Sequence, residues 1–535
     1  MTAPLAETTG PHPASLSKIA RGGSANLVGA AGGAVLTLLL TWVVTQGTEA
    51  GVAGSLFALT AVFLMVAAIA ELGSDVSLSK FLPHFLVEDR LADARATVRM
   101  AALVSFAGGS VVGAVLLVLR SQVADAVLGD TSGTPGSRAV AVLAVCVPLA
   151  AVTNTVLSAT RGLTAIRPTV LVDKIGRALL QVGFVGVALA AGAGLGGLTL
   201  AWALPYVVAT VVAISWFLVI ERRLVARSGP GLPPSARRDL WREYAVYTWP
   251  RVISRISQAI LQRADIVLVA ALRSPAEAAV YTVATRLFVI GQLGTQAIQQ
   301  VAAPHTSALL ASGDDRATKR VFQTVTAWTM SLTWPFFLAC LALAPLLLHV
   351  FGGTQYRAGD DVVIVLAVAA LLAAAGGPVD LILLMSGRSG LSLVNALVAL
   401  GINLVLNVLL IPPLGIVGAA IAWAAAIVVR NVLGMIQVSL TLHWLPFSRL
   451  SVIVGGLALG FFAVPAQFLK LVADPSDGVL VAVLAVGAAG YLVALWKLRD
   501  HLALTAFTAM LRRRPHPEPA GVLPTADETK PVPMS

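Results

Sequence analysis

Long apolar stretches alternate with short polar segments along almost the whole of this chain. A helix needs about 20 apolar residues to cross the ~30 Å hydrocarbon core of a bilayer. The pattern therefore predicts an all-α polytopic membrane protein with about 14 transmembrane helices. The expected spans lie near residues 25–46, 51–79, 100–119, 138–160, 168–191, 196–220, 247–271, 276–303, 321–350, 361–385, 391–411, 415–440, 450–471 and 478–497.

The composition agrees with this interpretation, because 57% of the 535 residues are hydrophobic and only 12% are charged. Soluble domains carry about 25% charged residues. The formal net charge of +11 resides mostly in short loops, where Lys and Arg orient helices in a membrane. We therefore expect membrane lipids around the chain and no nucleic-acid partner. Cys146 and Cys340 both lie inside apolar stretches, and neither indicates a metal site or a cofactor.

The distribution of Lys and Arg predicts the orientation of the chain. An even number of spans leaves both termini on one side of the membrane. The loops and tails on that side hold the basic clusters at 80–99, 161–167, 222–242, 316–320 and 497–514. The positive-inside rule then places both termini in the cytoplasm. Arg outnumbers Lys, and Ala, Val, Leu and Gly dominate, which is typical of a bacterial chain, so the expected location is a bacterial inner membrane. No loop on the opposite side is long enough for a catalytic domain.

An internal repeat indicates two similar halves. Residues 69–99 align without gaps with residues 290–320, and both segments contain Pro-His and Arg-Ala-Thr in register. Both segments cover the second helix of a half and the loop after it, so the halves share one orientation. Parallel repeats of this kind are known in transporters. We therefore expect two six-helix lobes related by a parallel repeat, followed by two further helices.

These observations divide the chain into six parts. The expected parts are a cytoplasmic N-terminal tail (1–20), a first lobe (21–221), a cytoplasmic linker (222–246), a second lobe (247–441), two C-terminal helices (442–500) and a partly disordered cytoplasmic tail (501–535).

Polar residues inside the predicted spans are costly, so they usually face a bundle interior or a wet cavity. On the seventh span, five polar residues follow helical steps of three and four, which predicts one polar face. They are Arg251, Arg255, Gln258, Gln262 and Asp265. We interpret the set as a net-cationic cavity between the lobes, because guanidinium groups bind phosphate oxygens through paired hydrogen bonds. The candidate substrate-binding residues are Arg177, Arg251, Arg255, Gln258, Gln262, Arg286, Gln292 and Gln296, and the candidates for coupling are Glu71, Asp75, Asp265 and Asp380.

A structural interpretation of the same residues remains open. Arg251 lies near the membrane surface, where its side chain can extend to the headgroups. Asp173 and Arg177 are four residues apart and can form an ion pair within one helix. Arg430, next to Asn431, can serve helix packing, and glutamines can join helices without any ligand. The four acidic residues can likewise be structural.

The segment from Phe351 to Ala426 contains FGGTQYRAG, GPVDLILLMSGRSGLSL and GINLVLNVLLIPPLGIVGAAIAWA in this order. It resembles the polysaccharide and O-antigen flippase branch of the multidrug/oligosaccharidyl-lipid/polysaccharide exporter superfamily. That branch has an FG-x-x-Y start, a Ser-Gly-Arg turn, an Asn-x-x-Leu-Asn helix and a Leu-Ile-Pro stretch. Tyr356 comes one residue later than the first of these patterns requires. The Arg-rich first helix of the lipid II flippase branch is not evident.

The resemblance implies a V-shaped pair of lobes and alternating access. It implies a transporter, not an enzyme, that flips a polyprenyl-(pyro)phosphate-linked oligosaccharide or related glycolipid to the outer face. Glycan-assembly enzymes are the further partners that such a substrate implies, and protons, Na⁺ or the membrane potential are the candidates for coupling. Two alternatives are an ion-coupled small-molecule antiporter of the same superfamily and a membrane glycosyltransferase or polymerase.

Overall fold

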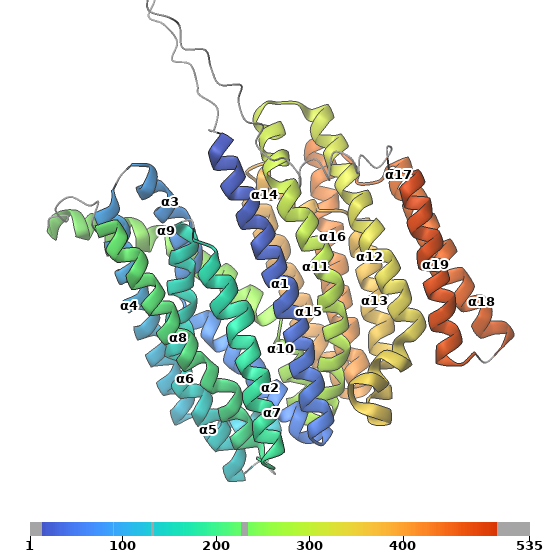
Figure 1. The fold of residues 1–535 in the computed structure, drawn as a ribbon, viewed down its shortest axis with the longest axis horizontal. Helices are drawn as coiled ribbons and strands as arrows, with labels where there is room; N and C mark the ends of the chain where they lie inside the picture. The colour runs from blue at the N-terminus through green and yellow to red at the C-terminus, as the bar shows by residue number, and fades with distance from the viewer. Residues whose placement is uncertain are drawn as a thin grey trace, which may run out of the picture.

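The computed structural model of the chain describes residues 13–88, 90–129, 133–163, 165–225, 234–473 and 475–499. Within these ranges every regular element is a helix, which confirms the expected all-α class (Figure 1). The predicted C-terminal tail, most of the N-terminal tail and the middle of the linker lie outside the described residues.

The first half of the chain forms eight α-helices and one π-helical segment. These are α1 (Pro13–Gly47), α2 (Ala50–Ala70), α3 (Ser74–Val87), α4 (Leu91–Val118), α5 (Arg120–Leu128), α6 (Gly133–Gly162), η2 (Thr169–Arg177), α7 (Ala178–Ala190) and α8 (Leu195–Val225).

The second half continues with long helices that alternate with shorter ones. These are α9 (Pro234–Leu261), α10 (Ala264–Leu272), α11 (Pro275–Ala311), α12 (Asp315–Gly352), η3 (Gly353–Gly359), α13 (Asp360–Ala375), α14 (Val379–Met385), α15 (Ser389–Leu414) and α16 (Ile416–Leu442). The C-terminal part contains α17 (Arg449–Ala458), η4 (Leu459–Ala463), α18 (Val464–Val472) and α19 (Asp477–Lys497).

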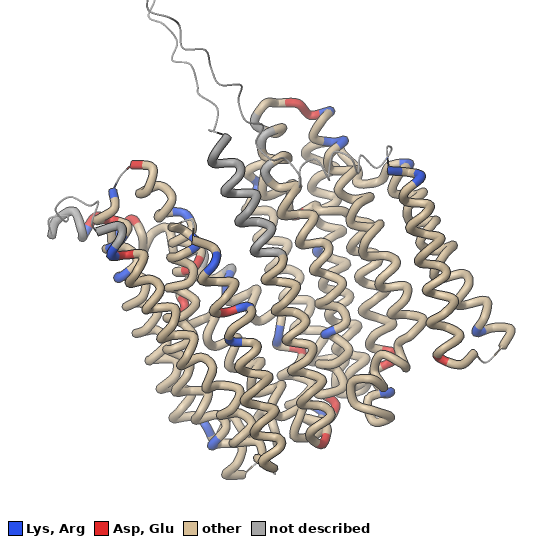
Figure 2. The backbone as a smooth tube through the Cα atoms, in the orientation of Figure 1, with Lys and Arg blue, Asp and Glu red and all other residues tan. Residues whose placement is uncertain are grey.

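Each predicted span coincides with one helix or with consecutive shorter helices. Ten segments of the described residues are long and apolar enough to cross a membrane. The chain is therefore a multi-pass membrane protein, and the count of fourteen spans stays a prediction. In Figure 2 the charged residues gather mainly near the helix ends, while a smaller number lie along the middle of the bundle.

Three expected spans are interrupted, and the one predicted at 361–385 divides into α13 and α14 at Gly377 (φ 71°) and Pro378. The span predicted at 51–79 forms α2 and α3, because Leu72 (φ 48°) and Gly73 (φ 69°) turn the chain between them. The span predicted at 247–271 forms α9 and α10, with Gln262 and Arg263 between them. By the sequence repeat, the counterpart of α2 and α3 is α11, which is continuous. The two halves therefore differ here, because the first half has a turn where the second half has an unbroken helix.

The hydrophobic cores show how the halves are joined. One large core contains buried residues of both halves, including Phe63 of α2, Val147 of α6, Val269 of α10 and Tyr281 of α11. It lies toward the end of the bundle where α2 and α11 begin. Toward the other end the cores are separate, one around α3, α4, α6 and α8 and others around α12, α14 and α16. This arrangement agrees with the V shape that the sequence resemblance implies (Figure 1).

The helix α9 packs against the half to which it does not belong in sequence. Its residue Tyr244 is buried in the same core as Leu78 and Phe81 of α3. The hydroxyls of Ser77 on α3 and Thr248 on α9 are 2.7 Å apart and share a hydrogen bond. The first part of α9 is therefore attached to the first half of the chain.

At the end with the shared core, α1 caps the last turn of α12. The side chains of Trp42 and Gln46 donate to the carbonyl of Val350 at 3.1 and 3.2 Å, and Thr45 donates to the carbonyl of Phe351. The last carbonyls of a helix have no partner within that helix. The contact therefore adds polar bonds between the halves at this end.

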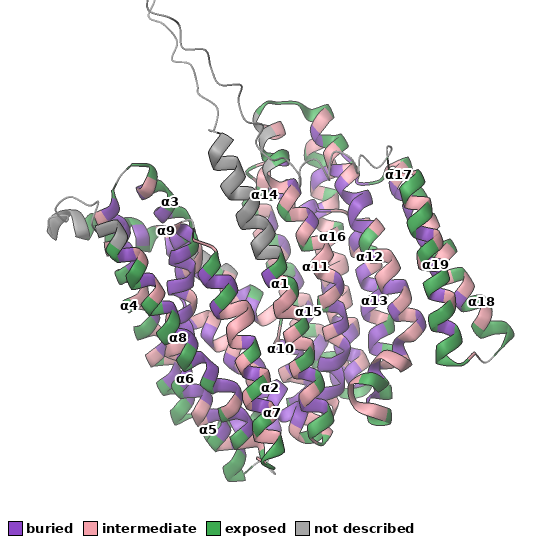
Figure 3. Ribbon diagram, in the orientation of Figure 1, coloured by how far each residue is buried: buried purple, intermediate pink, exposed green. Residues whose placement is uncertain are grey.

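The C-terminal helices α17–α19 pack along α12 and expose many side chains at the edge of the bundle (Figure 3). Pro335 of α12 has no N–H, so the carbonyl of Ser331 one turn earlier lacks its helical partner. The hydroxyl of Tyr491 on α19 donates to this carbonyl at 3.0 Å. A proline in one helix thus provides an attachment point for another.

Removal of the Tyr491 hydroxyl should weaken this attachment. We expect Tyr491→Phe to lower the free energy of unfolding by about 1 kcal/mol, because it leaves a partly buried carbonyl without a donor. Thermal unfolding of the purified protein in detergent measures the loss. In a Pro335→Ala background the restored N–H supplies the carbonyl, so the same change should cost much less. Equal losses in the two backgrounds would contradict the proposed role of Pro335.

Candidate functional site

The polar face predicted on the seventh span is shorter than expected. Gln258 and Gln262 are exposed near the end of α9, and Arg255 is half-buried one turn earlier. The interruption after Leu261 separates Asp265 from this face, and Asp265 is buried on α10. The five residues therefore do not share one continuous helical face. The side chain of Arg251 lies outside the described residues.

Arg255 lies between two of the acidic residues that the sequence suggested for coupling. Its guanidinium forms ion pairs with Asp75 at 3.0 Å and with Glu71 at 3.8 Å. The side chain of Glu71 is only 4% exposed and that of Asp75 is 15% exposed, whereas Arg255 is 33% exposed. Asn154 of α6 also donates to Glu71 at 2.6 Å. Arg255 is thus not the free cation that we expected, because two carboxylates offset its charge.

Arg286 of α11 has a different environment. It is half-buried, and its Nε atom is enclosed without a hydrogen-bond partner. None of the ion pairs among the described residues includes it; the charged residues that act on it are Arg263 and Asp265. Asp265 is already bound, since it accepts from the Tyr281 hydroxyl at 2.6 Å and from the Ile266 N–H at 2.9 Å. Arg286 therefore forms no ion pair within the described part of the chain, and Asp265 is the carboxylate that acts on it from beyond ion-pair distance.

The glutamines of α11 continue from Arg286 along the same helix. Gln292 is half-buried and Gln296 is exposed. Gln258 of α9 and Gln262, which follows the end of that helix, are also exposed. Exposed amides at the depth of the hydrocarbon core face water or protein, because lipid offers them no hydrogen bonds. These amides can therefore present hydrogen-bond donors and acceptors to a polar ligand.

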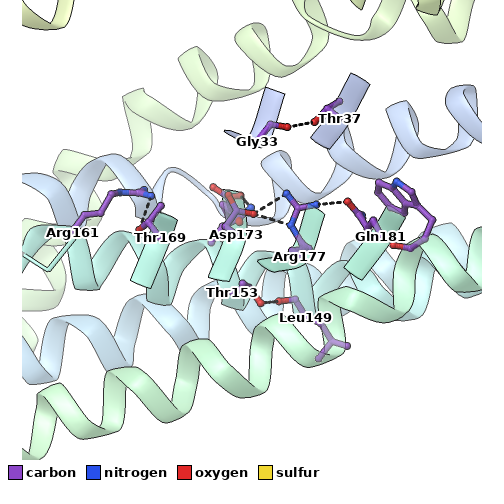
Figure 4. A network of polar contacts seen from close by, with 12 residues as sticks. Gly33, Thr37, Leu149, Thr153, Arg161, Thr169, Asp173, Arg177 and Gln181 are labelled. Atoms are coloured by element: carbon purple, nitrogen blue, oxygen red, sulfur yellow. Dashed lines mark hydrogen bonds and ion pairs between the residues drawn. The ribbon is translucent and has the colours of Figure 1, made fainter. Parts of the chain in front are cut away.

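Arg177 lies in a polar network of the first half (Figure 4). It contacts Asp173 through two bonds of 2.8 Å, and it donates to Gln181 at 3.1 Å. Its guanidinium also lies 4.8 Å from the centre of the Tyr206 ring. The expected pairing of Arg177 with Asp173 within one helix is confirmed, so this arginine too is charge-compensated.

Asp380 lies apart from the other acidic candidates. It forms an ion pair with Arg430 of α16 and accepts from the Ser392 hydroxyl at 3.3 Å, which joins α14, α15 and α16. Arg430 therefore pairs with a carboxylate of another helix, which agrees with the role in helix packing that the sequence left open.

Sequence reasoning missed three residues at this site. Asn154 was an isolated polar residue in an apolar span. Arg161 was assigned to a cytoplasmic loop, but it donates to Ser158 at 2.5 Å and acts electrostatically on Asp75 and Glu71. Arg263 lay off the predicted polar face. The helix interruption that reorients Arg263 had no clear signal in the sequence, because neither Gly nor Pro marks it.

Comparisons with known proteins agree with this fold and site. A family model described as polysaccharide biosynthesis protein matches residues 53–359. This is more than half of the chain, which therefore belongs to that family. The probable low-salt glycan biosynthesis flippase Agl15 of Haloferax volcanii is 25% identical over 187 residues, which are 35% of this chain and 40% of that protein. The match thus spans less than half of the relative.

Solved structures of two membrane transport proteins share the fold. The lipid II flippase MurJ in an inward closed conformation has a TM-score of 0.68 and 11% identity, over 88% of this chain and 98% of that chain. An inward-facing multidrug resistance MATE family transporter of the MOP superfamily has a TM-score of 0.58 and 16% identity, over 77% of this chain and 94% of that chain. At these identities the similarity concerns the fold alone. The family match and these shared folds agree with the resemblance that the sequence shows.

Proposed function

We propose that the protein is a transporter that flips a lipid-linked oligosaccharide across the membrane by alternating access. The substrate that we propose is a polyprenyl-(pyro)phosphate-linked oligosaccharide or a related glycolipid, moved from the cytoplasmic to the outer face. The observation that carries this proposal is Arg286 of α11, a half-buried cation that forms no ion pair among the described residues. A phosphate-bearing headgroup offers both the charge and the hydrogen bonds that this site lacks.

The direction of opening supports the same mechanism. With the orientation that the Lys and Arg distribution predicts, the end with the shared core faces outward and the end with separate cores faces the cytoplasm. A substrate made in the cytoplasm would then reach the site from the open end. We place the protein in a bacterial inner membrane with both termini in the cytoplasm, next to the glycan-assembly enzymes that produce and consume its substrate.

An energy source completes the proposal. We propose coupling to protons, Na⁺ or the membrane potential. Glu71 is our strongest coupling candidate, because it is buried and its oxygens contact Asn154 of α6 and Arg255 of α9. A change of its charge would alter contacts between segments that belong to different halves in sequence.

The fold similarity to a multidrug transporter favours one alternative, an ion-coupled small-molecule antiporter. Cells that lack the protein distinguish the two functions. If it is a flippase, these cells lose surface polysaccharide and accumulate the lipid-linked precursor on the cytoplasmic face, and the wild-type chain restores both. Normal surface polysaccharide together with increased sensitivity to toxic small molecules would instead support the antiporter.

A further inference from the structure

The turn between α2 and α3 has a strained backbone. Leu72 has a φ of 48°, and Gly73 after it has a φ of 69°. A leucine rarely adopts this left-handed conformation, because its Cβ atom crowds the carbonyl oxygen that follows. Strain of this kind persists only where the surrounding structure holds it, and it is common in segments that switch conformation. We call Leu72 and Gly73 the elbow.

The internal repeat shows that the same two residue types also fit a continuous helix. Leu293 and Gly294 occupy the positions of Leu72 and Gly73 in the second copy of the repeat. Both lie inside α11, which is unbroken from Pro275 to Ala311. The Leu-Gly pair by itself therefore does not impose the elbow, and its cause lies in the residues around it.

Two differences beside the elbow distinguish the copies. Where the first copy has Glu71 and Asp75, the second has Gln292 and Gln296. Carboxylates four residues apart repel each other along a continuous helix, whereas amides carry no charge. Arg255 of α9 forms ion pairs with both carboxylates, at 3.0 Å to Asp75 and 3.8 Å to Glu71. This guanidinium therefore joins the two sides of the elbow, and α11 has no acidic pair at the same positions.

The elbow is also the point at which the chain changes its packing partner. Before it, α2 lies so close to α11 that a Cβ atom on Gly54 would be 1.5 Å from the carbonyl oxygen of Pro275. After it, α3 packs against α9, where the hydroxyls of Ser77 and Thr248 are 2.7 Å apart. The first contact lies at the end with the shared core and the second at the end with separate cores. A change of angle at the elbow would therefore move one end of the bundle relative to the other.

We propose that the elbow is a two-state hinge, which Arg255 holds in the bent state through Glu71 and Asp75. In the other state α2 and α3 form one continuous helix, as α11 does. The bent state keeps the ion pairs despite the strained backbone, and the continuous helix relieves the strain once the ion pairs are broken. This inference rests on the alternating access of the proposed function and identifies a moving part of it.

The distance between spin labels on the two sides of the elbow tests the hinge in the purified full-length protein. Gly51→Cys on α2 and Ser79→Cys on α3 place the labels at exposed positions, and the buried Cys146 and Cys340 are replaced by alanine. A continuous helix would separate residues 51 and 79 by about 42 Å, from its rise per residue. A bent chain brings them closer, and we expect the wild type to populate mainly the shorter distance.

Variants of the charged residues test the role of Arg255. Glu71→Gln with Asp75→Gln reproduces the residues of the second copy and should shift the distribution toward the longer distance. Addition of Arg255→Gln removes the cation that these changes leave unpaired, so the triple variant should keep the shift without a buried lone charge. Glu88→Gln is the matched control, because Glu88 is an exposed carboxylate after the end of α3 and should leave the distance unchanged.

Variants of the elbow itself should act in opposite directions. Gly73→Ala should favour the longer distance, because alanine disfavours a positive φ and favours a continuous helix. Leu72→Gly should favour the shorter distance, because glycine adopts a positive φ without strain. A residue with only a structural role would not give opposite shifts of this kind.

The remaining outcomes separate the hinge from the proposed function. Wild-type distances in both Gly73→Ala and the triple variant would overturn the hinge. A shift in Gly73→Ala without one in the glutamine variants would overturn the role of Arg255. A fixed elbow in a chain that restores surface polysaccharide would overturn the hinge and leave the flippase. A moving elbow in a protein whose loss does not change surface polysaccharide would overturn only the proposed function.

Discussion

Replacement of Arg286 by alanine is expected to reduce export of surface polysaccharide tenfold or more while the protein stays folded. Loss of hydrogen bonds to a charged ligand typically costs about 1.5–3 kcal/mol, which is roughly tenfold or more in binding. Because Arg286 forms no ion pair among the described residues, its removal breaks none of their ion pairs and takes a charge out of the bundle. Export in complemented cells and thermal unfolding of the purified variant measure the two effects.

Two comparisons make this result specific. Arg286→Lys should restore only part of the export, because lysine keeps the charge but loses the forked donor geometry. Arg255→Ala should behave differently and lower the stability, since it leaves the carboxylates of Asp75 and Glu71 without their cation. If Arg286→Ala exports normally at wild-type abundance, Arg286 does not bind the headgroup.

Replacement of Gly54 by alanine is expected to disrupt the end of the bundle with the shared core. A Cβ atom at this position would lie 1.5 Å from the carbonyl oxygen of Pro275. A carbon and an oxygen come no closer than about 3.3 Å, so α2 and α11 would have to separate by roughly 2 Å. Overpacking of this kind typically costs about 1–3 kcal/mol. We expect lower thermal stability and loss of export.

The same helix supplies a matched control. Gly51 lies one turn before Gly54 on α2, and nothing lies within 4 Å of a Cβ atom built there. Gly51→Ala should therefore leave export unchanged and alter stability by no more than about 0.5 kcal/mol. Disulfide cross-linking between cysteines introduced on α2 and α11 near this end would report the separation. Unchanged cross-linking and export in Gly54→Ala would show that this close contact does not control the closed end.

The structure reproduces the part of the sequence prediction that depends on local pattern. Apolar stretches of membrane-spanning length specify helices, because the hydrocarbon core supplies no partner for an unpaired backbone group. Each expected span therefore has a helical counterpart. The spacing of Asp173 and Arg177 likewise predicted their ion pair, which needs only the geometry of one helical turn.

Partners from distant segments could not be predicted in this way. The polar face through Arg255 and Asp265 assumed a continuous helix, but the chain turns at Gln262 and Arg263. Arg255 meets Asp75 because α9 packs on α3, and no spacing along either helix encodes that contact. In the sequence, Arg255 and Arg286 are both arginines inside predicted spans. In the structure Arg255 pairs with carboxylates, whereas Arg286 forms no ion pair among the described residues.

The sequence by itself thus determined the membrane environment, the helical class and the two related halves, since each follows from local hydrophobicity or from repetition. Tertiary structure decided which intramembrane charges are compensated. An ion pair requires side chains within a few ångströms, and packing of helices far apart in the chain sets that distance. It neutralised Arg177 and Arg255 and left Arg286 without an ion pair among the described residues.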